Sequence, residues 1–161
     1  MTRAKGASVG PGAAGQGGGE RHRAREAALQ MLYQWEVGRA DIDEVVDTYW
    51  SIGQPGARPA SPAVQEFASS LFRATARSLG EIDPLITDAA EHWRLSRMAT
   101  IDRLVLRIAV CELTRDADTP PAVVINEALE LARRFSGEEA VGFVNGVLDA
   151  VRRRLEAPSS P

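Results

Sequence analysis

Apolar side chains recur every three or four positions through most of the chain, which is the spacing of helices that bury one face. The first helix is expected to begin at Arg21 and to end at Gly38, because glycine commonly follows the last helical residue. A second helix is expected to follow Asp41, whose carboxylate can cap it. The repeated glycines and prolines of residues 51–60 indicate a loop.

Further cap signals divide the rest of the chain into helices. Ser61–Pro62 and Asp83–Pro84 each place a capping side chain directly before a proline, which predicts a helix start at both points. The helix that begins at Pro62 is expected to end at Gly80. Later boundaries are expected at a capping threonine, at a turn and at a separating glycine: Thr100, residues 118–121 and Gly137.

The pattern predicts about seven helices and no convincing strand. The apolar residues 123–125 are the best candidate for a strand, but they continue directly into the helical pattern of residues 126–130. The fold class is therefore all-α, a compact helical bundle. Residues 1–19 hold seven of the 14 glycines and cannot bury enough apolar surface to fold, so we expect a disordered tail there. Residues 20–157 are expected to form the helical domain and residues 158–161 a loose C-terminal tail.

The composition suits a single domain. A chain of 161 residues with 44% hydrophobic residues can bury a core without disulfides. The one cysteine argues against a disulfide framework, and His22 and His92 are too far apart in sequence to favour a metal site or a His-dependent triad. No run of about 18 apolar residues would span a membrane, and the N-terminus has no apolar secretory signal. We therefore expect a soluble cytoplasmic protein.

The net charge of −3 conceals an uneven distribution. Residues 1–25 carry five cations against Glu20, a net charge of +4, whereas residues 26–161 carry 14 arginines against 21 acids, a net charge of −7. A basic arm on an acidic body is typical of a protein that binds nucleic acid, or an acidic partner, at one end.

Motifs for catalysis are missing from the sequence. It has no glycine-rich phosphate loop after a strand, no serine nucleophile elbow and no HExxH metal motif. Cys111 lies among apolar residues of a helix, where a small buried hydrophobe is expected rather than a reactive thiol. The sequence thus disfavours an enzyme and predicts no cofactor.

The most informative segment is the arginine-rich start of the first helix, residues 21–35. Arg21 and Arg25 are four residues apart and share a helical face, and guanidinium groups can grip two phosphate oxygens at once. Gln30 could read a base edge and Tyr33 could stack on an unpaired base, which suits single-stranded RNA better than duplex DNA. An amphipathic helix whose arginines only face water explains the same pattern equally well.

Three blocks of residues stand out between about Arg21 and Arg154. The blocks are Arg23-Ala24-Arg25-Glu26 with Ala28-Leu29-Gln30 and Leu32-Tyr33; Ile101-Asp102-Arg103 with Leu106-Arg107-Ile108-Ala109 and Glu112-Leu113; and Val124-Ile125-Asn126-Glu127-Ala128 with Glu130-Leu131-Ala132, Phe135 and Phe143-Val144-Asn145-Gly146-Val147-Leu148-Asp149. With these blocks, of which the last is the most specific, the sequence resembles the NusB family of bacterial transcription antitermination factors.

The resemblance implies an all-helical fold of two small subbundles. It implies binding of single-stranded boxA RNA in ribosomal RNA leader transcripts, together with the ribosomal protein NusE. It also implies action on the RNA polymerase elongation complex with NusA and NusG, so that the polymerase reads through terminators. A homodimer of the free protein is left open.

The resemblance also implies site residues. The N-terminal arginines match positions that contact RNA, with His22 standing where relatives often have another arginine. Asp102 matches an acidic position that faces NusE, and Gly142 stands where some relatives place a basic residue. The residues expected to bind RNA are Arg21, Arg23, Arg25, Gln30, Tyr33, Glu139 and Phe143.

Structural roles remain for several residues of these blocks. Arg103 and Arg107 could form ion pairs, and Asn126 and Glu127 could tie helices together, a role we favour over RNA contact. Gly146 could permit close helix packing by removing a side chain from an interface. Charge reversal at Arg21 and Arg25 is expected to weaken RNA binding and to leave the fold intact, because exposed arginines contribute little to stability.

Two other functions compete with this interpretation. A NusB-like domain also opens certain ribosomal RNA cytosine methyltransferases, although those continue into a Rossmann-like catalytic domain that is absent here unless the chain is a fragment. A DNA-binding regulator would need a helix-turn-helix and affinity for duplex DNA.

Overall fold

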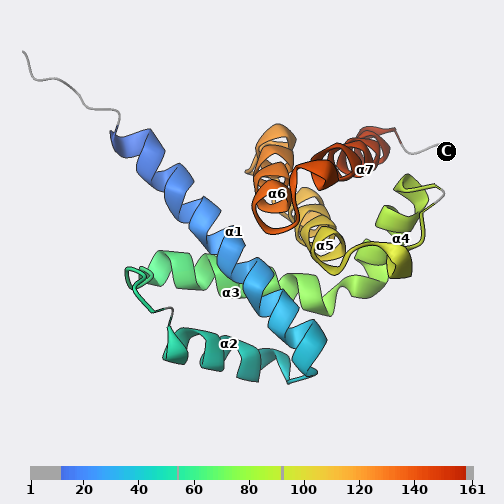
Figure 1. Ribbon diagram of the computed structural model, residues 1–161. Coiled ribbons are helices and arrows are strands. Elements are labelled where there is room, and N and C mark those ends of the chain that lie inside the picture. The colour runs from blue at the N-terminus through green and yellow to red at the C-terminus, as the bar shows by residue number, and fades with distance from the viewer. Residues whose placement is uncertain (1–11, 54, 92, 159–161) are drawn as a thin grey trace, which may run out of the picture.

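The computed structural model describes residues 12–53, 55–91 and 93–158, and these form seven α-helices, one short 3₁₀ helix and no strand (Figure 1). The prediction of an all-α fold is confirmed. The helices are α1 (Gly12–Gly38), α2 (Ile42–Ile52), α3 (Pro62–Arg77), α4 (Leu79–Ala89), η1 (Leu95–Arg97), α5 (Thr100–Arg115), α6 (Pro121–Phe135) and α7 (Glu138–Glu156).

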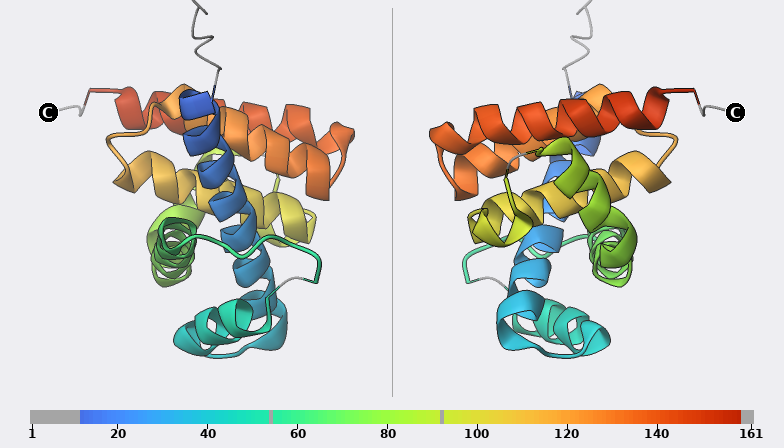
Figure 2. Two further views of the ribbon diagram at one scale, coloured as in Figure 1. Left: turned by 90° about the vertical axis from the view of Figure 1, so that its left-hand side faces the viewer. Right: turned by 90° about the vertical axis from the view of Figure 1, so that its right-hand side faces the viewer.

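The helices form two groups, as the resemblance implied. Helices α1, α2 and α3 pack together, and helices α4 to α7 make the second group. Figure 2 shows α2 at one end of the molecule and α6 with α7 at the other, with α1 running between them. Helix α5 contacts both α1 and α3, so it joins the two groups. None of the described helices is both long enough and apolar enough to cross a membrane.

Helix α5 is the centre of the core. Every residue from Leu104 to Glu112 is buried, which is the pattern of a helix surrounded on all sides. The large apolar side chains around it, including Phe72 of α3 and Leu148 of α7, are fully buried. Trp35 of α1 meets the edge of Phe72 with 6.4 Å between ring centroids, which fixes α1 against α3.

Most of the expected helix boundaries agree with the structure. Helix α1 ends at Gly38, and Gly137 precedes α7. Ser61 caps α3 by accepting a hydrogen bond of 3.2 Å from the Val64 N–H. Asp41 precedes α2 but makes no capping hydrogen bond with its side chain. Thr100 is the first residue of α5 rather than its cap, a position that Ala99 takes.

The boundary expected between Gly80 and Pro84 is wrong. Helix α3 ends at Arg77, α4 begins at Leu79, and both Gly80 and Pro84 lie inside α4. Asp83 cannot act as a cap because its carboxylate is bound by the Arg107 guanidinium of α5, at 2.9 and 3.0 Å. A tertiary ion pair therefore overrides the local signal.

Helix α1 also begins earlier than expected. It starts at Gly12, inside the segment for which the composition predicts a disordered tail, and residues 1–11 of that segment lie outside the described residues. Each glycine lowers helix stability by about 1 kcal/mol relative to alanine. The glycine-rich turns of α1 therefore depend on the packed turns that follow them. Helix α7 ends at Glu156, close to the predicted start of the C-terminal tail, of which residues 159–161 lie outside the described part.

Gly146 does not have the packing role that its motif suggested. It is exposed on α7, and a Cβ built at this position would meet nothing within 4 Å. The packing face of α7 is instead formed by Val144, Val147, Leu148 and Val151.

We predict that Pro84→Ala stabilises the fold. A proline inside a helix lacks one backbone donor and crowds the preceding turn, which costs up to about 3 kcal/mol. Alanine should restore the hydrogen bond to the preceding turn and raise the free energy of unfolding by about 1 kcal/mol or more, measured by urea denaturation. The matched control is Pro62→Ala at the first position of α3, where proline is well tolerated and no gain is expected.

Candidate nucleic-acid interface

Arg25, expected to face RNA, is buried in the core. It is 3% exposed, and its guanidinium donates to both carboxylate oxygens of Glu112 on α5, at 2.7 and 2.9 Å. Glu112 is 4% exposed. Burial disfavours the charged guanidinium, but the hydrogen bond and the charge of Glu112 outweigh this and raise the pKa of Arg25 above its ordinary value. Arg25 is therefore not free to grip a phosphate in this arrangement.

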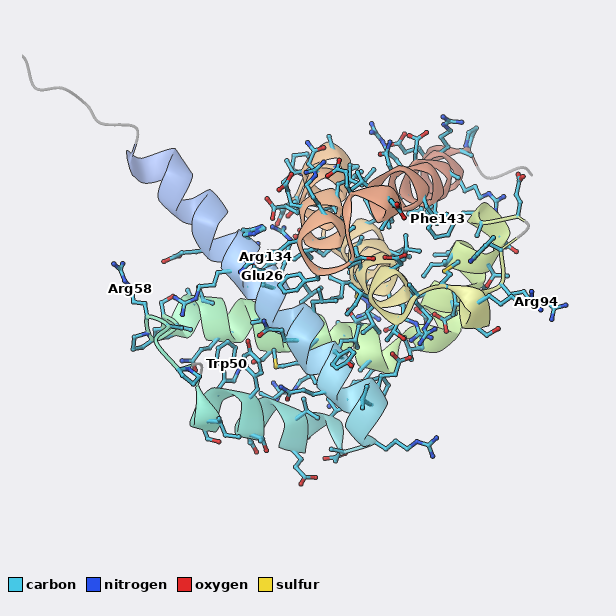
Figure 3. The ribbon with its side chains drawn as sticks, in the orientation of Figure 1. Glu26, Trp50, Arg58, Arg94, Arg134 and Phe143 are labelled. Atoms are coloured by element: carbon cyan, nitrogen blue, oxygen red, sulfur yellow. The ribbon has the colours of Figure 1, made fainter. Side chains whose placement is uncertain are left out.

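Polar side chains beside the Arg25–Glu112 pair connect it to α6. Glu127 of α6 lies 3.9 Å from the Arg25 guanidinium and 2.7 Å from Nδ1 of His22, while Nε2 of His22 lies 3.0 Å from Glu26. Glu26 also accepts a hydrogen bond from Arg134 of α6, and Figure 3 shows these two side chains close together. Glu127 thus ties α6 to α1, the structural role we favoured for it. Asn126 is exposed.

Arg21 remains accessible at the start of this face. It is exposed, and its guanidinium carbon lies 4.2 Å from the centre of the Phe67 ring on α3. Stacking on an aromatic ring orients a guanidinium while leaving its N–H groups free to donate. The shallow hollow beside it has a volume of about 390 Å³ and is also lined by Arg25, Asp116 and Glu127.

Asp116 organises the turn below Arg21. Its carboxylate accepts from the Thr119 hydroxyl at 2.5 Å and from the backbone N–H groups of Asp118 and Thr119, at 3.0 and 3.2 Å. These bonds, the hydroxyl bond foremost, hold the pKa of Asp116 below its ordinary value despite partial burial. The turn between α5 and α6 is therefore a preformed wall of the hollow.

Arg23 and Gln30 open onto a different hollow, between α1, α2 and the loop that precedes α3. Its volume is about 280 Å³, and its walls include Tyr49 and Trp50. The Tyr49 hydroxyl donates to Oε1 of Gln30 at 2.5 Å. The arginines at 21 and 23 therefore face two different hollows, although they are two residues apart.

The structure brings together Asp102, Glu139 and Phe143, which come from two separate sequence blocks. They line one groove of about 890 Å³ between the start of α5 and the start of α7. Trp93, which sequence reasoning did not select, is 53% exposed in the same groove and meets Phe143 edge to face, with 6.3 Å between ring centroids. The sequence offers no signal for it, because the exposure of a tryptophan is known only from the folded chain. His92, beside it in sequence, lies outside the described residues.

The remaining residues of the blocks have separate places. Tyr33 is exposed, at 44%, farther along α1. Arg103 pairs with Glu36 of α1 at 2.9 Å, and Arg107 contacts Glu36 at 3.3 Å in addition to Asp83. The predicted ion pairs therefore exist, and they run between helices. Asp102 has one buried carboxylate oxygen without a hydrogen-bond partner.

The chemistry of a catalytic or metal site does not emerge from these residues. Cys111 is 1% exposed, and burial raises the pKa of its thiol, as expected for a packing residue. Within the described part of the chain, no three His, Cys, Asp or Glu side chains are grouped so as to hold a metal ion.

Comparison with known proteins relates this arrangement to one family. The model of the NusB family matches residues 22–153. A relative from Solibacter usitatus (strain Ellin6076), named transcription antitermination protein NusB, is 46% identical over 88% of this chain and 94% of its own length. A relative of the same name from Koribacter versatilis (strain Ellin345) is 47% identical over 86% of this chain and 92% of its own length.

Solved structures agree with the sequence comparison. The structure of T. maritima NusB matches with a TM-score of 0.72 and 34% identity, over 83% of this chain and 90% of that one. A structure of the antitermination factors NusB and NusE in complex with dsRNA matches with a TM-score of 0.69 and 27% identity, over 84% of this chain and 97% of that one.

We predict that Arg25→Ala destabilises the fold by about 3–5 kcal/mol, because it leaves the Glu112 carboxylate buried without its partner. This replaces the expectation that changing Arg25 leaves the fold intact. The measurement is urea denaturation followed by circular dichroism. Arg21→Ala is the matched control and should cost less than about 1 kcal/mol. The double variant Arg25→Met/Glu112→Leu should recover most of the loss, and equal losses for Arg21→Ala and Arg25→Ala would contradict the assignment.

Asp116 should add to the acid sensitivity of the fold. Since its pKa is lower in the folded chain, its stabilising effect is complete above the pKa of the unfolded carboxyl, about 3.9, and is lost as the pH falls through the folded pKa. The free energy of unfolding should therefore fall less steeply below about pH 4 in Asp116→Asn than in the unchanged chain. Asp47→Asn, at an exposed position on α2, is the matched control.

Proposed function

The chain belongs to the NusB family, and on this premise we propose that it is a transcription antitermination factor that binds boxA RNA of ribosomal RNA leader transcripts together with the ribosomal protein NusE. In this role it acts on the RNA polymerase elongation complex with NusA and NusG and helps the polymerase read through terminators. It works in the cytoplasm, where bacterial transcripts are made.

Family membership favours this function over the methyltransferase alternative. The curated relatives from Solibacter and Koribacter are matched over 94% and 92% of their own lengths and carry the name of an antitermination protein. Nearly the whole length of these relatives therefore consists of the domain described here. Their name is that of a transcription factor, in agreement with the prediction that the chain is not an enzyme.

The observation that best supports RNA binding is that the arginines of α1 have different surroundings, one in the core and two at the surface. Arg25 is locked to Glu112 in the core, and this holds the helix so that Arg21 and Arg23 face outward on either side. Ordered guanidinium groups lose little freedom when they bind phosphate. Residues 1–25 carry a net charge of +4 whereas the rest of the chain is net negative, so the start of α1 is the part of the chain whose net charge favours RNA.

The remaining proposed contacts follow the groove and the exposed aromatic residue. Glu139 and Phe143 line the groove with Trp93, where an unpaired base would stack on an aromatic ring. Asp102, at the same groove, offers a carboxylate to a basic side chain of NusE. Tyr33 contributes an exposed ring farther along α1.

The NusB–NusE–dsRNA neighbour supports the choice of partners, since it joins the same family and the same ribosomal protein in one complex with RNA. For this chain we infer the same partners and single-stranded RNA as the target. The third hypothesis, a duplex DNA regulator, predicts the reverse preference between the two nucleic acids.

The test is binding of the full chain to a boxA-like single-stranded RNA, with and without NusE, against a scrambled RNA and a DNA duplex. We expect tight binding to the boxA-like RNA only with NusE. Arg21→Glu should weaken it roughly tenfold, and each lost phosphate contact should reduce the salt slope by about 0.7. Arg152→Glu on α7 is the matched control.

Equal binding to both RNAs, without any effect of NusE, would mean that the arginines of α1 bind polyanions without sequence specificity. Preference for the duplex would support the DNA regulator instead. An affinity that does not change between low and moderate salt would contradict the phosphate contacts.

A further inference from the structure

The hollow beside Arg23 has the features of a binding site for one unpaired nucleotide. It lies where residues 23–30 of α1, the end of α2 and the start of α3 meet loop residues 53 and 57–60. Figure 3 shows Trp50 between α2 and α3, with Arg58 at the outer edge of the loop. None of the aromatic or loop residues here was selected from the sequence.

Fixed side chains form the inner walls. Trp50 donates its indole N–H to the Ser69 hydroxyl at 2.8 Å, and its ring meets Tyr49 edge to face with 4.8 Å between centroids. Gln30 is oriented by the Tyr49 hydroxyl, and Gln65 donates to the Ala60 carbonyl at 3.0 Å. The walls thus combine aromatic surface with amide groups already held in place, which is the combination that proteins use to stack and to read an unpaired base.

The described loop residues that border the hollow are held in place by local geometry and by one contact to α1. Gly53 ends α2 with a φ of 67°, a left-handed conformation that favours glycine, and Gly56 has a φ of 75°. Arg23 of α1 donates to the Arg58 carbonyl and so anchors the loop to the helix. Little order should therefore have to be created when a ligand enters.

The mouth of the hollow is cationic. Arg23 and the exposed Arg58 stand at its edge, and the Glu26 carboxylate on the same wall is engaged by His22 and Arg134. Guanidinium groups at the edge of an aromatic hollow suit a planar base whose phosphates remain outside.

The volume sets the size of the ligand. At about 280 Å³ the hollow lies just below the usual range for small-molecule sites, which is about 300–1,000 Å³. A hollow of this size suits a single small planar group such as one base. A helix, a strand or a duplex would not enter.

We propose that this hollow receives one extruded base of a single-stranded RNA, with the adjoining phosphates held by Arg23 and Arg58. The base stacks against the Tyr49–Trp50 wall, and Gln30 and Gln65 face its edge. The inference rests on the proposed function, because it assumes that single-stranded RNA is the ligand, and it adds a recognition site on the side of α1 that faces α2.

The first test fills the hollow. Ala57 lines it from the loop and is itself exposed, so Ala57→Phe should occupy the space without disturbing the core. With NusE present, affinity for the boxA-like RNA should fall roughly 5- to 150-fold, the range expected for losing one stacked base. Ala63→Phe, at an exposed position of α3 outside the hollow, is the matched control and should bind normally.

The second test identifies the base. A series of boxA-like RNAs, each with one abasic position, should reveal a position whose loss weakens binding to the unchanged chain. That same loss should have little effect on Ala57→Phe, because the two changes remove one shared contact. Arg58→Ala should weaken binding roughly fivefold and lower the salt slope, whereas Arg152→Ala should do neither.

A third test uses the unchanged chain and does not depend on any variant folding. An RNA that carries 4-thiouridine at the sensitive position should crosslink to Tyr49 or Trp50. Crosslinks confined to the groove of Trp93 and Phe143, with normal binding by Ala57→Phe, would overturn the inference and leave the proposed function standing. Failure of the unchanged chain to bind RNA, with or without NusE, would remove the proposed function as well.

Discussion

The buried pair between Arg25 and Glu112 is the interaction on which the orientation of α1, and with it the proposed RNA-binding side of the molecule, depends. It joins α1 to the central helix α5 through two charge-assisted hydrogen bonds, and both residues are almost completely buried. Such a pair adds little net stability compared with apolar residues of the same size, because both charges must leave water. Its value lies in geometry: only one rotation of α1 satisfies both charges, and that rotation decides which other residues of α1 face outward.

The same helix therefore serves the core and the surface. Ala28, Leu32 and Trp35 pack inward, and the polar residues around Arg25 are distributed between two hollows on either side. Ion pairs from Arg103 and Arg107 to Glu36 hold the far end of α1 to α5 in the same way. Helix α1 is thus held to α5 at two points along its length, which gives it the rigid position that the proposed phosphate contacts would require.

Three surfaces follow from this frame. The hollows beside Arg21 and Arg23 lie on α1. The groove of Asp102 and Phe143 lies in the second group of helices, between the first residues of α5 and those of α7. A flexible single strand of RNA could follow separate contact points of this kind. The groove combines carboxylates with the aromatic rings of Trp93 and Phe143, which suits a basic side chain of a protein partner beside an unpaired base.

The sequence by itself determined the helices, because the period of apolar residues and a cap such as Ser61 are local properties. It also determined the family, through blocks whose residues stand at fixed spacings. The start of α4 could not be predicted from the neighbouring residues. The Asp83 carboxylate binds Arg107, 24 residues away, instead of capping a helix. The hollow of Tyr49 and Trp50 was likewise beyond reach, because three helices and a loop must meet to enclose it.

Arg21 and Arg25 show this limit most clearly. They are the same residue type on one face of one helix, and nothing in their neighbourhood along the chain separates them. The tertiary structure alone decided that Arg21 is exposed over Phe67 and that Arg25 is buried against Glu112, a residue 87 positions away. Helical periodicity depends on near neighbours, but the partner of a charge depends on which distant helix is packed beside it.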